Sequence, residues 1–222
     1  MNEPHMGTTL FVLALLLSPA GAPAGETELA YPPTISLEEV RQWVDRAPKE
    51  HPRLLATPAE LTALPSTLDR DPTRRMLADA VVSQARALLD LPPVTRTLTG
   101  RRLLGVSRQT VKRVFTLAMA YHLEGDTRYA RRAEKEMLAA AAFGDWNPSH
   151  FLDVAEMTLA LAIGYDWLHH QLDPGSRETI RAALVDKGVA LQFDGEHTGW
   201  VQATNNWGQV CHGGLTAGAL AV

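Results

Sequence analysis

The residues best suited to chemistry lie together near the end of the printed sequence. Asn205, Asn206, Gln209 and His212 cluster at the start of an apolar run that continues to Val222. Neutral amides donate hydrogen bonds to an anion without adding a counter-charge, and an imidazole takes up or returns a proton near neutral pH. Buried amides need partners, so this cluster is better suited to lining a polar cleft than to filling a core.

A second polar cluster precedes the most apolar part of the sequence. Trp146, Asn147 and His150 lie in a loop that leads directly into the apolar stretch 151–170. His150 follows a proline-containing loop and does not sit on an apolar helix face, which favours a position at a rim. These three residues are candidates for contact with a ligand.

Several candidates have an equally good structural interpretation. Trp146 and Trp207 are suited either to stacking on a sugar ring or to packing in a core. Glu156 lies in an apolar stretch and must be paired there, so it either orients the site or forms a structural ion pair with an arginine. His212 could equally be a core histidine whose nitrogens are hydrogen-bonded within the fold, and Asn206 could be a helix cap.

Helices position the two clusters. Strand patterns are absent, and stretches that are apolar on nearly every side alternate with stretches that have one charged face. Alternating inner and outer helices, arranged as antiparallel hairpins, predict an all-α, two-layer ring or solenoid. The short turns 124–126 and 173–176 then lie at one end, and the long loops 144–150 and 193–205 share the other end. The two polar clusters should therefore be neighbours.

Local signals predict three earlier helices. Ser36 and Glu39 form a capping box for a helix that runs to about Ala47, and Thr57 caps a second helix in which Pro58 takes the first position. A third helix should cover roughly 73–89.

Composition excludes several classes of protein. A net charge of −4 argues against a nucleic-acid binder that works by bulk charge, and the single cysteine excludes an internal disulfide. No acidic residue lies between Leu91 and Leu123, although this segment is rich in arginine. That segment either forms a solvated basic face or creates a local positive potential that attracts an anionic substrate. His169 and His170 have no third ligand at a suitable spacing, so no metal site is expected. No cofactor is expected either.

The first residues are typical of a secretory signal. An apolar core at 10–17 precedes Ala22-Pro23-Ala24, although no lysine or arginine comes before it. We therefore expect export to the periplasm or beyond, with a signal peptide at 1–24, a leader with one helix at 25–50 and a helical domain at 51–222. No segment is long and apolar enough for a membrane span.

The ordered motifs resemble one family. They are similar to the N-terminal, alginate-lyase-like domain of heparinase II/III-like polysaccharide lyases at 51–55, 147–157, 162–167 and 205–214. The resemblance implies an incomplete (α/α) toroid, cut inside an inner helix, with a C-terminal β-sandwich absent from this sequence. It also implies a tyrosine and a histidine beyond Val222, so the chain alone is expected to be inactive or incomplete.

The resemblance further implies β-elimination on an anionic, uronic-acid polysaccharide such as a heparin-type glycosaminoglycan or alginate. The proton next to the carboxylate is barely acidic, so donors must tighten on the carboxylate as enolate-like charge develops. Asn206 and Gln209 suit that role, and His212 suits a base. The expected substrate-binding residues are Asn205, Trp207, Trp146, Asn147, His150 and Glu156.

Two other functions are weighed against the lyase. Tyr121–Tyr129 also suits a tetratricopeptide-like hairpin, in a module that binds peptides or carbohydrate without catalysis, but that repeat has a period of about 34 residues, shorter than the spacing here. A glycoside hydrolase needs two opposed carboxylates, whereas Asp153 and Glu156 lie on one helix three residues apart.

Overall fold

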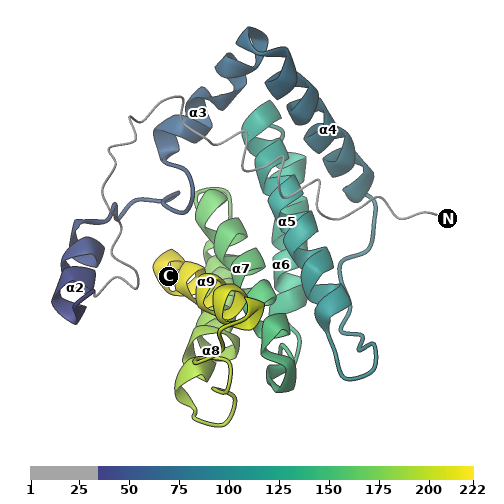
Figure 1. The fold of residues 1–222 in the computed structure, drawn as a ribbon. Helices are drawn as coiled ribbons and strands as arrows, with labels where there is room; N and C mark the ends of the chain where they lie inside the picture. Colours follow the sequence, from purple (N-terminus) through teal and green to yellow (C-terminus); the bar gives the residue numbers. More distant parts are fainter. Residues whose placement is uncertain (1–34) are drawn as a thin grey trace.

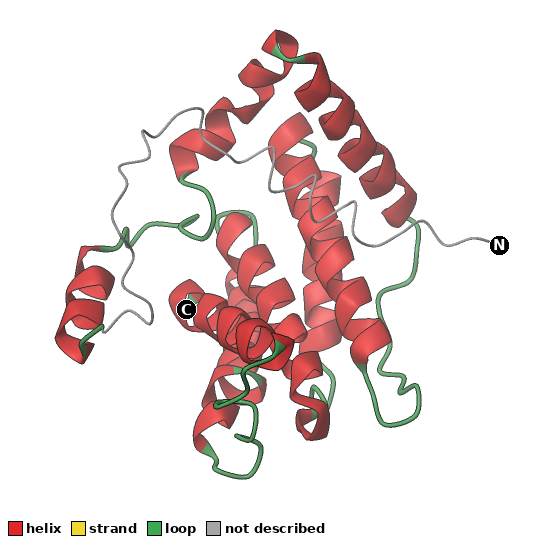
Figure 2. Ribbon diagram, in the orientation of Figure 1, coloured by secondary structure: helices red, strands yellow, loops and turns green. Residues whose placement is uncertain are grey.

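The computed structural model describes residues 35–222, and this part of the chain consists of helices and connecting loops (Figure 2). The all-α class predicted from the sequence is therefore confirmed. The predicted signal peptide at 1–24 and the beginning of the leader lie outside the described residues.

The first three helices begin where their caps predict. Helix α2 (Leu37–Arg46) follows the capping box of Ser36 and Glu39, and α3 (Pro58–Thr67) follows Thr57. Helix α4 (Pro72–Leu88) follows Asp71, whose side chain accepts backbone N–H bonds from the first turn. Helices α3 and α4 lie across one end of α5, while α2 stands apart and has no buried residue (Figure 1).

The remaining helices form the two layers. They are α5 (Leu104–Glu124), α6 (Thr127–Ala141), α7 (Phe151–Trp167), α8 (Pro174–Lys187) and α9 (Asn206–Ala221), with short 3-10 turns at Leu68–Arg70, Pro148–His150 and Val189–Phe193. Helix α5 ends at Gly125, whose φ of 70° is a left-handed conformation that glycine adopts without strain.

Helix α7 lies at the centre of the domain, with nearly all its residues buried. It packs against α5 on one side and α9 on the other, while α6 packs on α5 and contacts α8 behind them (Figure 1). The inner and outer layers therefore follow the order predicted from the sequence. The inner helices start at Leu104, Phe151 and Asn206, much farther apart than the roughly 34 residues of a tetratricopeptide repeat.

Glycines bring α9 close to α7. A side-chain carbon on Gly214 would run into the carbonyl oxygen of Ala155, and one on Gly218 would run into Thr158. The backbones can approach this closely only because both positions lack a Cβ.

None of the helices within residues 35–222 combines the length and apolar character needed to cross a membrane.

Candidate functional site

The starts of three inner helices meet at one end of the domain. The ring of Trp207, in the first turn of α9, packs edge-on against His150, just before α7, with ring centroids 5.1 Å apart. The backbone N–H of Leu103, just before α5, donates to Asp153 in the first turn of α7 at 2.7 Å. We call this end the rim, defined by the first turns of α5, α7 and α9. Each helix start carries a partial positive charge; the buried Asp153 carboxylate already lies at the starts of α5 and α7, so the start of α9 is the one that remains to favour an anion.

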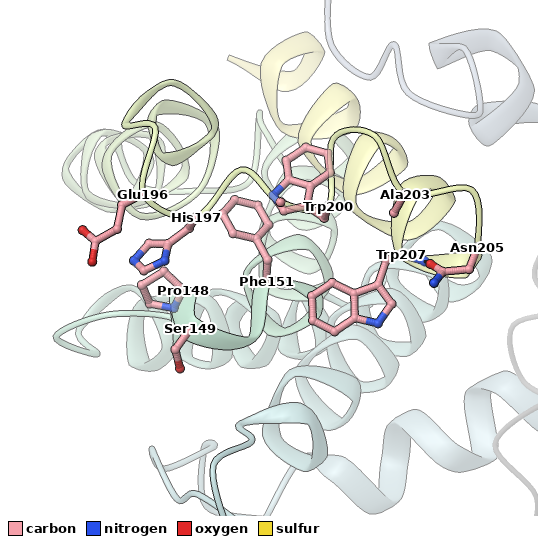
Figure 3. Close-up of a pocket in the computed structure, with 10 residues that line it drawn as sticks. Pro148, Ser149, Phe151, Glu196, His197, Trp200, Ala203, Asn205 and Trp207 are labelled. Carbon is pink, nitrogen blue, oxygen red and sulfur yellow. The ribbon is translucent and has the colours of Figure 1, made fainter.

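A pocket of about 470 Å³ opens at the rim between the two long loops (Figure 3). Its aromatic lining includes Phe151 and Trp200, whose rings stack 5.0 Å apart, and Trp207. Its polar lining is made by Ser149, Glu196, His197 and Asn205. Aromatic faces beside hydrogen-bonding groups suit a sugar ring, which is apolar on its faces and polar at its edge.

The amide cluster of α9 lies at the surface of the rim. The Oδ1 of Asn205 accepts the backbone N–H of Trp207 at 3.0 Å, so Asn205 caps the helix while also lining the pocket. Asn206 and Gln209 are exposed, and their side chains form no hydrogen bond with residues 35–222. Both amides are therefore available to a ligand, although neither lines the pocket itself.

His212 is also exposed, one turn beyond Gly208. Its Nε2 lies 3.3 Å from the carbonyl oxygen of Val201, and its ring packs against Trp200 with centroids 4.8 Å apart. The alternative of a core histidine is thus excluded. The ring holds the loop 194–205 against α9 while remaining open to solvent.

Four of the six residues expected to bind substrate do not line the pocket, which corrects the prediction from the sequence: Trp146, Asn147, His150 and Glu156. Trp146 is fully buried, and its indole N–H donates to the carbonyl oxygen of Ala140 at 3.0 Å. Asn147 adopts a left-handed conformation, and its amide donates to Asp153 at 2.7 Å and to the carbonyl oxygen of Arg101 at 2.9 Å. Both side chains are satisfied within the fold, so they shape the loop and have nothing left to offer a sugar.

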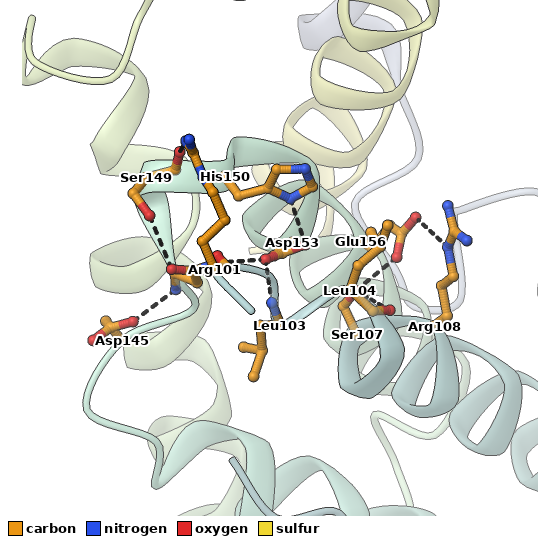
Figure 4. Close-up of polar contacts among 11 residues, drawn as sticks. Arg101, Leu103, Leu104, Ser107, Arg108, Asp145, Ser149, His150, Asp153 and Glu156 are labelled. Carbon is orange, nitrogen blue, oxygen red and sulfur yellow. Dashed lines mark hydrogen bonds and ion pairs between the residues drawn. The ribbon is translucent and has the colours of Figure 1, made fainter. Parts of the chain in front are cut away.

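The sequence interpretation also missed Asp153 as a member of the site. Asp153 is fully buried and accepts hydrogen bonds from Leu103, Asn147 and His150, the last at 2.8 Å from the His150 Nδ1 (Figure 4). The available signal was its position: an acid three residues after a histidine, at the start of an apolar helix, must find partners nearby.

Glu156 forms the ion pair that was one of its two expected roles. Its carboxylate accepts a bond from the Ser107 hydroxyl at 2.7 Å and pairs with the Arg108 guanidinium at 3.3 Å (Figure 4). Burial raises the pKa of Glu156, although both partners oppose that rise. Across from it, burial and the nearby Glu156 raise the pKa of the Cys211 thiol to about 12, so this buried cysteine is not a nucleophile at neutral pH.

Arginines flank the rim. Arg101 reaches the carbonyl oxygen of Ser149 at 3.4 Å, and Arg108 lies on the other side of the His150–Asp153 pair (Figure 4). Arg102 is exposed beside Arg101. Within the described part of the chain, no cluster of histidine, cysteine, aspartate and glutamate has the arrangement needed to hold a metal ion.

No protein-family model matches this chain, and no curated protein is similar enough in sequence to be identified as a relative.

Proposed function

We propose that this chain is the helical domain of a polysaccharide lyase that is exported and that binds uronic-acid polymers at the rim. The observation that carries the proposal is the meeting of three helix starts with exposed neutral amides and arginines beside one pocket. This combination offers positive potential, hydrogen-bond donors and an aromatic surface together. A sugar carrying a carboxylate uses all three.

The amides supply what β-elimination requires. A uronate becomes acidic at C5 only when the charge on its carboxylate is offset, because proton removal places further negative charge on the same group. Asn206 and Gln209 are exposed and uncommitted within the described residues, so they can donate to that carboxylate. The resemblance of 205–214 to the polysaccharide lyases supports the same assignment.

The proposal is tested by calorimetric titration of the chain with oligosaccharides of alginate and heparin, with neutral dextran oligosaccharides as the comparison. Asn206→Ala should weaken uronate binding about tenfold, since a hydrogen bond to a charged group contributes about 1.5 kcal/mol. Gln42→Ala, which removes an exposed amide from α2, is the matched control and should leave affinity unchanged.

Two outcomes contradict this function. Equal affinity for dextran and uronates would mean that the carboxylate is not recognised. Equal losses of affinity in Asn206→Ala and Gln42→Ala would mean that the rim is not the binding site. Ultraviolet absorbance from unsaturated uronate ends measures elimination in the same samples. Binding without such products would limit the chain to recognition of the polymer.

A further inference from the structure

We propose that His150 is the residue that moves a proton at the rim, through its Nε2, and that Asp153 is the positioning residue that fixes its tautomer. The inference rests on the proposed function for its substrate, a uronate. The pairing of His150 with Asp153 is argued from the geometry of the described residues alone. It adds a proton-transfer group that lies beside the pocket and not on α9.

The hydrogen bonds of Asp153 determine which nitrogen of His150 carries the proton. Its Oδ2 accepts from the backbone N–H of Leu103 and from the amide of Asn147, both at 2.7 Å, and neither group can do anything but donate. Its Oδ1 lies 2.8 Å from the His150 Nδ1. Because the carboxylate accepts at both oxygens, Nδ1 donates the shared hydrogen and Nε2 carries the lone pair of a base.

His150 is buried, with 5% of its surface exposed, and its Nε2 is the ring nitrogen left without a partner within residues 35–222. Figure 4 shows Nδ1 facing Asp153 and the other ring nitrogen turned away from it. This nitrogen has no hydrogen bond with residues 35–222, and it is not enclosed by protein as the unpartnered Nε1 of Trp200 is. The His150 ring contacts Trp207, which lines the pocket, and its sequence neighbours Ser149 and Phe151 line the pocket too, although His150 itself does not.

The step balances without any further reactant. Nε2 takes the C5 proton of the uronate, and the electrons of that C–H bond move into the carboxylate to give an enolate. Return of a proton to C5 exchanges the hydrogen, whereas collapse of the enolate forms the C4–C5 double bond. The C4–O4 bond breaks, its electrons leave with O4, and the imidazolium returns the proton to that oxygen. The buried Asp153 carboxylate beside Nδ1 stabilises the imidazolium between the two transfers.

The tautomer is tested first, by the ¹⁵N chemical shifts of the histidine rings in the full chain. The neutral His150 should show a protonated Nδ1 and an unprotonated Nε2. His122 is an internal control with the opposite tautomer, because its Nε2 lies 2.9 Å from the carbonyl oxygen of Trp167 and must donate to it. A His150 that shows the same tautomer as His122 would overturn the inference without reference to any substrate.

The proton transfer is tested next, by exchange of the C5 hydrogen of alginate oligosaccharides in deuterium oxide. His150→Gln retains a donor for Asp153 but has no basic nitrogen, so exchange should fall about a hundredfold or more. His170→Gln, which replaces an exposed histidine near His51, should exchange at the wild-type rate.

Binding separates failure of this inference from failure of the proposed function. If oligosaccharides bind but exchange is absent, or persists in His150→Gln, the proton-transfer role is wrong and the binding function stands. If no uronate binds to a chain whose His150 has the expected tautomer, the proposed function fails instead.

Discussion

At the residue scale, three fully buried carboxylates in α6 and α7 have the same structural task. Each accepts a backbone N–H from a loop far earlier in the chain: Leu103 for Asp153, Val94 for Glu136, and Arg53 and Leu54 for Asp166. A buried charge is tolerated only with several good partners, so each acid fixes its loop against the inner layer. One partner of Asp153, His150, packs its ring against Trp207 in the lining of the rim pocket.

Residues far from the rim set a pH dependence of stability. His169 stacks face to face on His51 at 4.0 Å, and its Nδ1 is buried without a hydrogen-bond partner among residues 35–222. Burial, followed by the charges of His51 and neighbouring basic groups, lowers the pKa of His169 from 6.5 to about 4. Burial also lowers the pKa of His51, although its bond to Asp166 opposes the shift.

We predict that stability falls as the pH is lowered from about 6.5 to about 4. A histidine with a lowered pKa in the folded state binds its proton more readily when unfolded, so its contribution is fully present above 6.5 and is lost through this window. Urea unfolding at a series of pH values measures the slope. His169→Asn, which cannot titrate, should flatten it, and a variant with the wild-type slope would contradict the assignment.

Residue roles were the least predictable part of the site. Asn206 and Gln209 are exposed, as residues lining a cleft would be, but neither lines the pocket, and Asn205 rather than Asn206 caps α9. Trp146 and Asn147 were misassigned, since a polar loop gives no signal of which side chains turn inward. One partner of Asp153, Leu103, lies fifty positions away, and no local pattern identifies it.

At the element scale, the sequence predicted most helix boundaries because local chemistry decides them. Ser36 and Thr57 form the capping boxes expected of them, and Gly125 ends α5 in the left-handed conformation. The layer order was also predictable, since a helix apolar on all sides has to be buried. The closeness of α7 and α9 was not, because it depends on which glycines face the neighbouring backbone.

This close packing predicts that Gly214→Ala destabilises the domain. The added methyl would collide with the Ala155 carbonyl oxygen, which belongs to the backbone and cannot rotate away. Overpacking of this kind costs about 1–3 kcal/mol, even though alanine is the better helix former. The free energy of unfolding in urea measures the loss.

The neighbouring glycine is the matched control. In the described part of the chain a Cβ at Gly213 would have no atom within 4 Å, so Gly213→Ala should stabilise the domain by up to about 1 kcal/mol through helix propensity alone. The same substitution at adjacent positions of α9 should thus have opposite effects. If both variants are stabilised, α9 is not packed on α7 as described.

At the scale of the whole molecule, positive charge is concentrated in one segment although the net charge is negative. The chain carries −4 overall, yet the segment between Leu91 and Leu123 has no acidic residue. Part of its positive charge is neutralised by the fold, because Arg96 pairs with Asp145 and Arg113 pairs with the buried Glu136. The arginines left at the surface of this segment lie beside the rim, where helix starts add to their field.

Under the proposed function, this distribution predicts that the position of a charge, and not the net charge, decides the affinity for a uronate polymer. Arg102 is exposed beside the rim, and its side chain forms no ion pair within residues 35–222, whereas Arg131 is exposed on the outer helix α6. Arg102→Ala and Arg131→Ala change the net charge equally. Arg102→Ala alone should weaken alginate binding, by about two- to fivefold at low salt, as expected for an exposed charge contact.

The dependence of binding on salt concentration distinguishes two roles of Arg102: a long-range electrostatic attraction and a direct contact with the polymer. At about 1 M salt the Debye length falls to about 3 Å, so the difference between wild type and Arg102→Ala should disappear if the arginine acts through its field. Calorimetric titration at both salt concentrations measures this. Equal losses in the two variants at low salt would mean that the polymer senses only the overall charge, and the arginines at the rim would then have no part in recognition.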